Sequence, residues 1–261
     1  MCMNRTLTLV VVGILLLFAA SVQANITLTS GNSTAQIDTS TNMSSWIVDG
    51  KSQVYEQDWW IRVGEGPQYR LGDYLSASWT QLSDNVLQGT FTGNGISAIA
   101  TYILNGGAVG SKTSDIAEIL SVTSTGREAV TIYQYCDFDL GETPDDDYAK
   151  LLNQNTIQQT DGTWRMQESV VPTPPAGWEI GPSNTILSKL QNQSGLDLAK
   201  TSAQFGPGDA TFAWQWDMAV GQSSLIISKD KHLSSVPEPF SVMLGLLGFS
   251  SIAGYRKLRR K

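Results

Sequence analysis

Apolar and polar residues alternate along most of this 261-residue chain, with the period of two that is typical of β-strands. The alternating runs are short, and residues that favour turns separate them. Asp49-Gly50 and Asp161-Gly162, for example, are dipeptides typical of tight hairpin turns. The pattern therefore predicts an all-β protein in which most strands pair with their neighbours in sequence.

The chain between the two ends has enough strands for one large sandwich. We expect strands over residues 25–29, 34–38, 46–48, 53–63, 79–84, 86–92, 95–104, 115–123, 128–140, 155–159, 163–167, 211–220 and 223–229. A helical turn or short helix is expected over 148–154 and over 183–193. This series predicts a β-sandwich with jelly-roll or Greek-key connections.

A proline- and glycine-rich segment, residues 171–182, interrupts this series. It is either a rigid surface loop or a boundary between two subdomains. The loop is favoured, because too little chain follows for a second sandwich. Trp178 within it is then an exposed aromatic side chain.

The first 24 residues have the layout of a secretory signal peptide. Arg5 supplies a positive charge, an apolar stretch covers residues 7–20, and Val22-Gln23-Ala24 offers small residues before a cleavage point. We expect a signal helix over residues 1–24 that is cleaved between Ala24 and Asn25. The alternative is an uncleaved membrane anchor, for which the apolar stretch is short.

The other end carries three features in a fixed order. Pro237, Glu238 and Pro239 precede an apolar run over residues 240–255, which five bases follow: Arg256, Lys257, Arg259, Arg260 and Lys261. At about 1.5 Å per residue the run is about 24 Å long as a helix, against about 30 Å of bilayer hydrocarbon. The bases favour the cytoplasmic side, so the pattern predicts a marginal transmembrane helix with the rest of the chain outside.

This C-terminal arrangement resembles the PEP-CTERM sorting signal of bacteria that make extracellular polysaccharide. The resemblance covers residues 234–261, with the motif at 236–239, a transmembrane helix at 240–255 and a basic tail at 256–261. It implies that a membrane protease, exosortase, recognises Pro237, Glu238 and Pro239. It further implies a transient anchor in the inner membrane, followed by transfer to the cell envelope or extracellular matrix. No catalytic role passes to any residue of this chain.

The composition limits what the predicted domain, residues 25–233, can do. The chain has a net charge of −7 although five bases lie in the tail, so the domain is acidic and a nucleic-acid partner is not expected. Cys136 is the one cysteine left after the signal peptide, which excludes an internal disulfide, and its alternating surroundings predict a buried thiol. With His232 as the one histidine, chemistry based on several histidines is excluded.

Acidic residues gather at the end of the strand expected over 128–140 and in the loop that follows it: Asp137, Asp139, Glu142, Asp145, Asp146 and Asp147. Oxygen ligands on a strand end and its following loop suit Ca²⁺, although the spacing differs from an EF-hand loop. A solvated acidic loop is the alternative. A third use is a pair of catalytic carboxyl groups acting on a sugar, for which Asp137, Asp139 and Glu168 are the candidates.

Tryptophan is abundant, with 8 residues, and aromatic faces stack on sugar rings. Trp59 and Trp178 are the candidates for such contacts, whereas Phe212, Trp214 and Trp216 share one face of a strand and are expected in the core.

The sequence leaves three functions open. The first is an exported surface or matrix protein that associates with extracellular polysaccharide without catalysis and needs no cofactor, apart from the Ca²⁺ that the acidic segment suits. The second is a polysaccharide-modifying hydrolase or lyase that uses paired carboxylates. The third is a structural or adhesive module.

Overall fold

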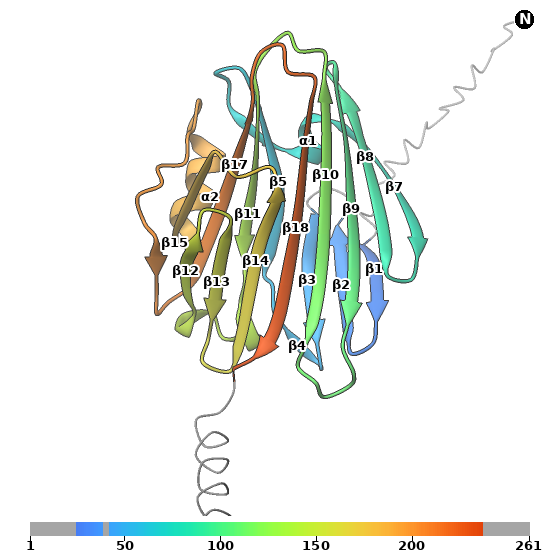
Figure 1. The fold of residues 1–261 in the computed structure, drawn as a ribbon, viewed down its shortest axis with the longest axis vertical. Helices are drawn as coiled ribbons and strands as arrows, with labels where there is room; N and C mark the ends of the chain where they lie inside the picture. The colour runs from blue at the N-terminus through green and yellow to red at the C-terminus, as the bar shows by residue number, and fades with distance from the viewer. Residues whose placement is uncertain (1–24, 39–41, 237–261) are drawn as a thin grey trace, which may run out of the picture.

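The computed structural model describes residues 25–38 and 42–236, which form two antiparallel β-sheets packed face to face (Figure 1). The predicted all-β sandwich is confirmed. The predicted signal peptide up to Ala24, the motif from Pro237 to Pro239, the helix over 240–255 and the basic tail lie outside the described residues. Within those residues, no helix has the length and apolar character needed to cross a membrane.

The first sheet holds the early strands and the centre of the chain. Its order is β1-β2-β3-β5-β11-β17-β15, and β4 and β6 pair with β3 and β5. The strands are β1 (Asn25–Ser30), β2 (Ser33–Asp38), β3 (Asn42–Val48), β4 (Lys51–Ser52), β5 (Glu56–Val63), β6 (Gln68–Arg70), β11 (Val130–Asp137), β15 (Gly177–Pro182) and β17 (Ala210–Met218).

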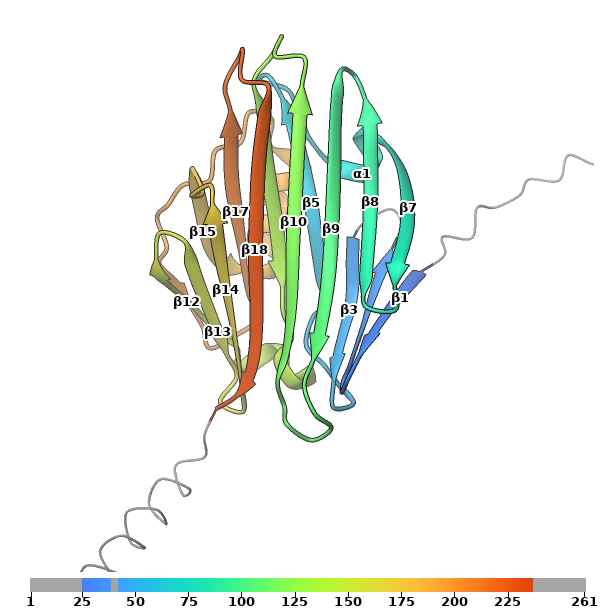
Figure 2. The same cartoon turned by 45° about the vertical axis from the view of Figure 1, so that its right-hand side comes forward.

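The second sheet has the order β16-β12-β13-β14-β18-β10-β9-β8-β7. Its strands are β7 (Ser76–Ser83), β8 (Val86–Gly93), β9 (Ile96–Gly106), β10 (Ser114–Ser124), β12 (Tyr148–Asn153), β13 (Thr156–Thr160), β14 (Trp164–Pro172), β16 (Gln204–Phe205) and β18 (Ser224–Ser235). Figure 2 shows β18, the last described strand, running along most of the height of this sheet beside β10.

Large apolar side chains from both sheets fill the interior. Phe212, Trp214 and Trp216 are buried there, as the alternation on β17 predicts. Trp59 corrects an expectation: it is 1% exposed and packs against Trp216, with ring centroids 5.9 Å apart, so it does not offer a surface for a sugar. Cys136 is buried, as predicted.

Over residues 25–38 and 42–236, four short helical elements accompany the strands: α1 (Leu71–Tyr74), η1 (Leu140–Glu142), η2 (Pro144–Asp146) and α2 (Ser183–Asn192). The helix expected near residue 183 is therefore confirmed. Its buried residues, Ile186 and Leu190, pack on Trp60, Tyr133 and other side chains of the outer face of the first sheet. That face is thus partly covered, and a second small core lies beneath α2.

Two local predictions of secondary structure were wrong, and in each the pairing of strands outweighed the local sequence. Residues 148–153 form β12, because β13 and β16 pair with it on either side. The proline-rich segment contains the end of β14 and all of β15, an edge strand, where proline is tolerated. Trp178 is consequently half-buried on β15 rather than exposed in a loop. Ser234 and Ser235, the first residues of the segment that resembles a sorting signal, belong to β18, where they pair with Arg165 and Trp164 of β14.

Candidate acid–base site

A group of carboxyl side chains lies where β11 ends on the outer face of the first sheet. Asp137 is the last residue of β11, and its neighbours across the sheet are Glu56 on β5 and Thr211 on β17. Asp139 follows two residues later, and Asp209 directly precedes β17. Adjacent strands therefore bring together residues that lie about 70 positions apart in the sequence.

Asp137, Asp139 and Asp209 form the centre of this group, which we call the aspartate site. One carboxylate oxygen from each lies within 4.8 Å of the others. Asp137 is buried, whereas Asp139 and Asp209 are half-buried. Tyr135 donates its hydroxyl to Asp137 Oδ2 at 3.0 Å, and Ser183, at the start of α2, donates its hydroxyl to Asp209 Oδ2 at 2.5 Å. The site thus combines one enclosed carboxyl with two that reach the surface.

Burial and repulsion by neighbouring carboxylates raise the pKa values of two members of this site, Asp137 and Asp139, towards neutrality. Burial, together with the charges of Asp209, Asp139 and Glu56, raises the pKa of Asp137 to about 7. Burial and the charges of Asp209 and Asp145 raise the pKa of Asp139 to about 6. At neutral pH, Asp137 is therefore in equilibrium between its acid and its base, as a group that transfers protons must be.

Glu56 and Asp58 on β5 form a second pair of carboxyl side chains. Arg70 lies with Nε 2.9 Å from Asp58 Oδ2 and also forms an ion pair with Glu56. Burial, followed by a hydrogen bond with Glu56, raises the pKa of Asp58 well above its usual range. This pair has a cation beside it, whereas no ion pair is present on the three members of the aspartate site within the described residues.

The other predicted acidic ligands do not join the site. Glu142 forms an exposed ion pair with Lys51 at 2.9 Å, and Asp145 and Asp146 are exposed on η2. Asp147 is buried and accepts a hydrogen bond from Gln159 Nε2 at 2.8 Å. Two of the six acids in the predicted calcium segment therefore come together.

Glu168, the third carboxyl proposed for catalysis, lies in a different place. It is fully buried between the sheets and forms ion pairs with Lys229 and Lys231. The expected grouping of Asp137, Asp139 and Glu168 is wrong, because alternation along β14 directs Glu168 into the core.

Asp209 is the residue that sequence reasoning missed. It follows the turn-forming run Gly206-Pro207-Gly208 and begins the approach to β17, so its place at a strand end was readable. Its proximity to Asp137 depends on the pairing of β11 with β17, which the sequence pattern does not specify. Tyr135 and Ser183 join the site for the same reason.

Among the described residues, the three carboxylates of the aspartate site form no ion pair with a basic side chain, so they are also suited to binding a metal cation. Asp137 Oδ1 is buried and has no hydrogen-bond partner among the described atoms. Ca²⁺ takes six to eight oxygens, so the three aspartates would supply part of its shell. Protons and a divalent cation would compete for the same oxygens. Of the predicted calcium ligands, Asp137 and Asp139 remain candidates, and Asp209 joins them.

Millimolar Ca²⁺ is accordingly expected to raise the melting temperature of the protein by several degrees, because a ligand at 100 times its Kd adds about 2.7 kcal/mol of stability. Differential scanning calorimetry with and without EDTA measures the shift. Asp209→Asn should abolish it, whereas Asp145→Asn, which removes an exposed charge outside the site, should leave it intact. An unchanged melting temperature in the unsubstituted protein would remove the calcium hypothesis.

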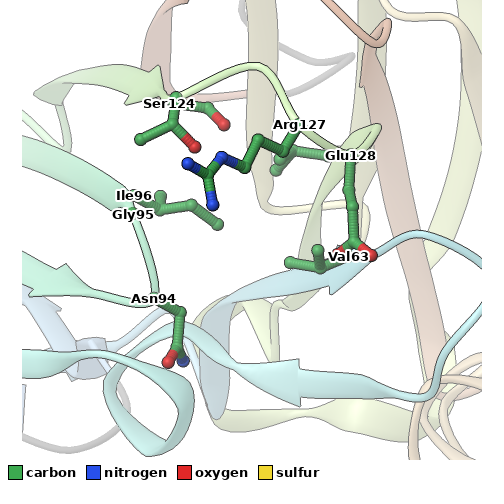
Figure 3. Close-up of a pocket in the computed structure, with 9 residues that line it drawn as sticks. Val63, Asn94, Gly95, Ile96, Ser124, Arg127 and Glu128 are labelled. Atoms are coloured by element: carbon green, nitrogen blue, oxygen red, sulfur yellow. The ribbon is translucent and has the colours of Figure 1, made fainter.

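A separate cavity of about 530 Å³ lies at the other end of β11, where strand ends of the two sheets face each other (Figure 3). Val63 and Val130 of the first sheet line it, together with Ile96 and Ser124 of the second. The Arg127 side chain reaches across it towards Ser124, whereas Glu128 points towards Val63. The cavity has the volume of a small-ligand site. It contains one carboxyl group, that of Glu128, so this cavity does not offer paired carboxyl chemistry.

Comparison with known proteins relates the chain to others through its fold. No family model and no curated protein matches it. Among solved structures, a bacterial glucoamylase complexed with acarbose matches with a TM-score of 0.60 and 11% identity, over 87% of this chain and 36% of that chain. This chain therefore spans about a third of the glucoamylase.

Two sugar epimerase structures match over nearly their whole length. The galactose 1-epimerase from Lactobacillus acidophilus NCFM has a TM-score of 0.54 and 9% identity, over 82% of this chain and 95% of that one. A GalM/aldose epimerase homologue from C. elegans has a TM-score of 0.52 and 8% identity, over 82% and 99%. The chain is thus a two-sheet sandwich that resembles the galactose mutarotase-like fold, and identities this low show the fold alone.

Proposed function

We propose that this chain acts on extracellular polysaccharide as a hydrolase or lyase, with proton transfer at the aspartate site. The observation that carries the proposal is the grouping of Asp137, Asp139 and Asp209, whose carboxylate oxygens lie within 4.8 Å of one another at the surface end of β11, and burial there raises the pKa of Asp137 to about 7. The fold supports a carbohydrate as the substrate class, because structures named for a galactose epimerase and for a glucoamylase share it.

The chemistry divides between unlike carboxyl groups. Asp137 in its protonated form would donate to the leaving oxygen of a glycosidic bond, and the carboxyl group of Asp139 or Asp209 would attack or stabilise the sugar. The separation of at most 4.8 Å between their oxygens is closer to the spacing of retaining glycosidases, about 5–5.5 Å, than to that of inverting ones. For a lyase, Asp137 in its basic form would remove a proton from the sugar ring.

The test is to incubate the full chain with the polysaccharide of the producing bacterium and to assay for new reducing or unsaturated ends. Asp137→Asn is expected to lower the rate by about 10²-fold or more, since it removes the proton-transfer group. Asp145→Asn serves as the matched control and should retain the rate. If the unsubstituted protein produces no new ends, the enzymatic proposal is abandoned.

A second candidate function is association with polysaccharide without catalysis, and the cavity beside Arg127 favours it. Within the described residues, the Arg127 guanidinium forms no ion pair, so it is free to bind an acidic sugar. In this case the protein would sediment with the polysaccharide, no new ends would appear, and Arg127→Ala would weaken the sedimentation. A structural or adhesive module would show neither signal and would associate with itself.

Export and sorting form a separate part of the proposal. The signal peptide and the PEP-CTERM-like tail imply export, a transient inner-membrane anchor, and exosortase processing at Pro237, Glu238 and Pro239. We also propose a signal helix at the start of the chain, a transmembrane helix at its end, and jelly-roll or Greek-key connections between the strands. The mass of the protein recovered from the producing cell tests the processing at both ends. Replacing the three motif residues by alanine should leave the tail uncleaved, and an unchanged mature mass would contradict the sorting role.

A further inference from the structure

Four charged side chains lie between the sheets, far from either surface. Glu118 on β10, Glu168 on β14, and Lys229 and Lys231 on β18 are each at most 1% exposed. All four point inwards from adjacent strands of the second sheet. Their charges balance, but each buried ion still loses its hydration by water. A core of this kind therefore calls for a chemical explanation.

The four groups are in mutual contact. Lys229 Nζ lies 3.3 Å from Glu118 Oε2 and 3.5 Å from Glu168 Oε1. Lys231 Nζ lies 3.3 Å from Glu168 Oε2 and also forms an ion pair with Glu118. Each amine is thus held against both carboxyl groups, with atoms at the separation from which bonds form.

The two carboxyl groups have different surroundings. Glu118 accepts hydrogen bonds from Gln57 at 2.7 Å and from Gln134 at 2.8 Å. Although burial opposes ionisation, Lys229 and Lys231 hold the pKa of Glu118 at about 2, so this group stays a carboxylate. Glu168 instead accepts a hydrogen bond on Oε1 from the indole N–H of Trp214 at 2.7 Å, which suits it to carry negative charge on that oxygen.

The two lysines differ as well. Burial lowers the pKa of Lys229, so its amine loses a proton more readily. The pKa of Lys231 is raised, because the charges of Glu118 and Glu168 outweigh burial, so it remains a proton donor. The ring of Trp59 lies 4.8 Å from Lys229 Nζ and restricts where this amine can move. A nucleophile, a base, an electrophile and an acid are therefore assembled in one enclosed site.

We propose that Lys229 and Glu168 join in an intramolecular amide bond. Glu118 removes a proton from the Lys229 ammonium, and the free amine attacks Cδ of Glu168. Trp214 stabilises the charge that develops on Glu168 Oε1. Lys231 donates one proton to Oε2 and the attacking nitrogen of Lys229 gives up a second to the same oxygen, so that Oε2 leaves as water. Glu118 then passes the proton it took to Lys231. One ammonium and one carboxylate thereby become an amide and one water molecule, with no oxidant or cofactor.

The position of this bond suggests its purpose. Lys229 pairs with Val170, two residues from Glu168, so the two side chains are diagonal neighbours on one face. The bond would connect β14 to β18, the strand that leads directly to residue 237 and the tail. Cys136 has no partner cysteine in the exported domain, so a disulfide cannot strengthen this strand. The inference is independent of the proposed enzymatic function.

Peptide mass spectrometry of the full chain, denatured and digested with trypsin, tests the bond. Trypsin does not cut at a lysine whose amine is acylated. The expected product is residues 166–189 joined to residues 201–231, lighter than the sum of the two peptides by one water molecule. Recovery of the separate peptides 166–189 and 201–229 in full yield from the unsubstituted protein would overturn the proposal, as would a bond at Lys231 or Glu118.

Two variants separate the roles. Lys229→Met removes the nucleophile and Glu118→Gln removes the base while keeping an oxygen for Gln57 and Gln134. Both are expected to yield only the unlinked 166–189 peptide. A Glu118→Gln protein that forms the bond at the original rate would overturn the role assigned to Glu118. The result from the unsubstituted protein decides the main claim even if either variant fails to fold.

Discussion

Replacing Asp147 by asparagine is expected to remove about 1.4 kcal/mol per pH unit from the loss of stability expected for this protein as the pH rises from about 5 to about 8. Asp147 is fully buried, and burial raises its pKa to about 9. Its usual value in an unfolded chain is about 4. The folded protein therefore keeps a proton on Asp147 at neutral pH that the unfolded chain releases.

The direction in which stability changes with pH follows from this difference between the two pKa values of Asp147. A pKa raised on folding adds stability that is complete below about pH 4 and is lost as the pH rises towards about 9. Between these limits the free energy of unfolding falls by about 1.4 kcal/mol per pH unit from this residue alone. Asparagine keeps the oxygen that accepts from Gln159 and does not titrate, so its variant should lack this slope.

Urea denaturation at a series of pH values measures the effect. Asp145→Asn is the matched control, because Asp145 is exposed two positions away. The Asp147→Asn protein should exceed the unsubstituted protein in stability by an amount that grows with pH. Equal slopes for the two proteins would show that Asp147 is ionised in the folded state.

Lys231→Met is expected to destabilise the protein by about 3–5 kcal/mol, because it leaves an uncompensated negative charge in the core. Lys231 is fully buried against Glu118 and Glu168. The excess charge is the same whether Lys229 and Glu168 are free or linked, so the prediction does not depend on the cross-link. Chemical denaturation at neutral pH gives the change in free energy of unfolding.

The double variant Glu118→Gln, Lys231→Met distinguishes charge balance from lost packing. It restores neutrality and retains an oxygen for the two glutamines that contact Glu118. Most of the lost stability should therefore return. Lys200→Met, at an exposed lysine, should cost less than about 0.5 kcal/mol. If the double variant is as unstable as Lys231→Met, the single effect arises from the fit of the side chain and not from its charge.

Several expectations were correct because they depend only on the alternation of side chains along a single strand. Alternation along β11 places Asp137 on the opposite face from Cys136, and the same rule places Phe212, Trp214 and Trp216 in the core. By contrast, the same acidic segment continues into η1 and η2, where the chain turns away from the site. Glu142 and Asp147 leave it there, the first towards Lys51 and the second towards Gln159.

What the sequence by itself determined is the class of fold and the position of most strands, because a period of two and turn-forming dipeptides act over a few neighbouring residues. It also identified the helix at residue 183 and the buried thiol of Cys136. The tertiary structure alone decided which strands are neighbours. The pairing of β11 with β17 brings Asp209 to Asp137, and the pairing of β14 with β18 sets Glu168 beside two lysines. Such contacts depend on the register between distant segments, which no local pattern specifies, and the chemistry proposed for this protein rests on them.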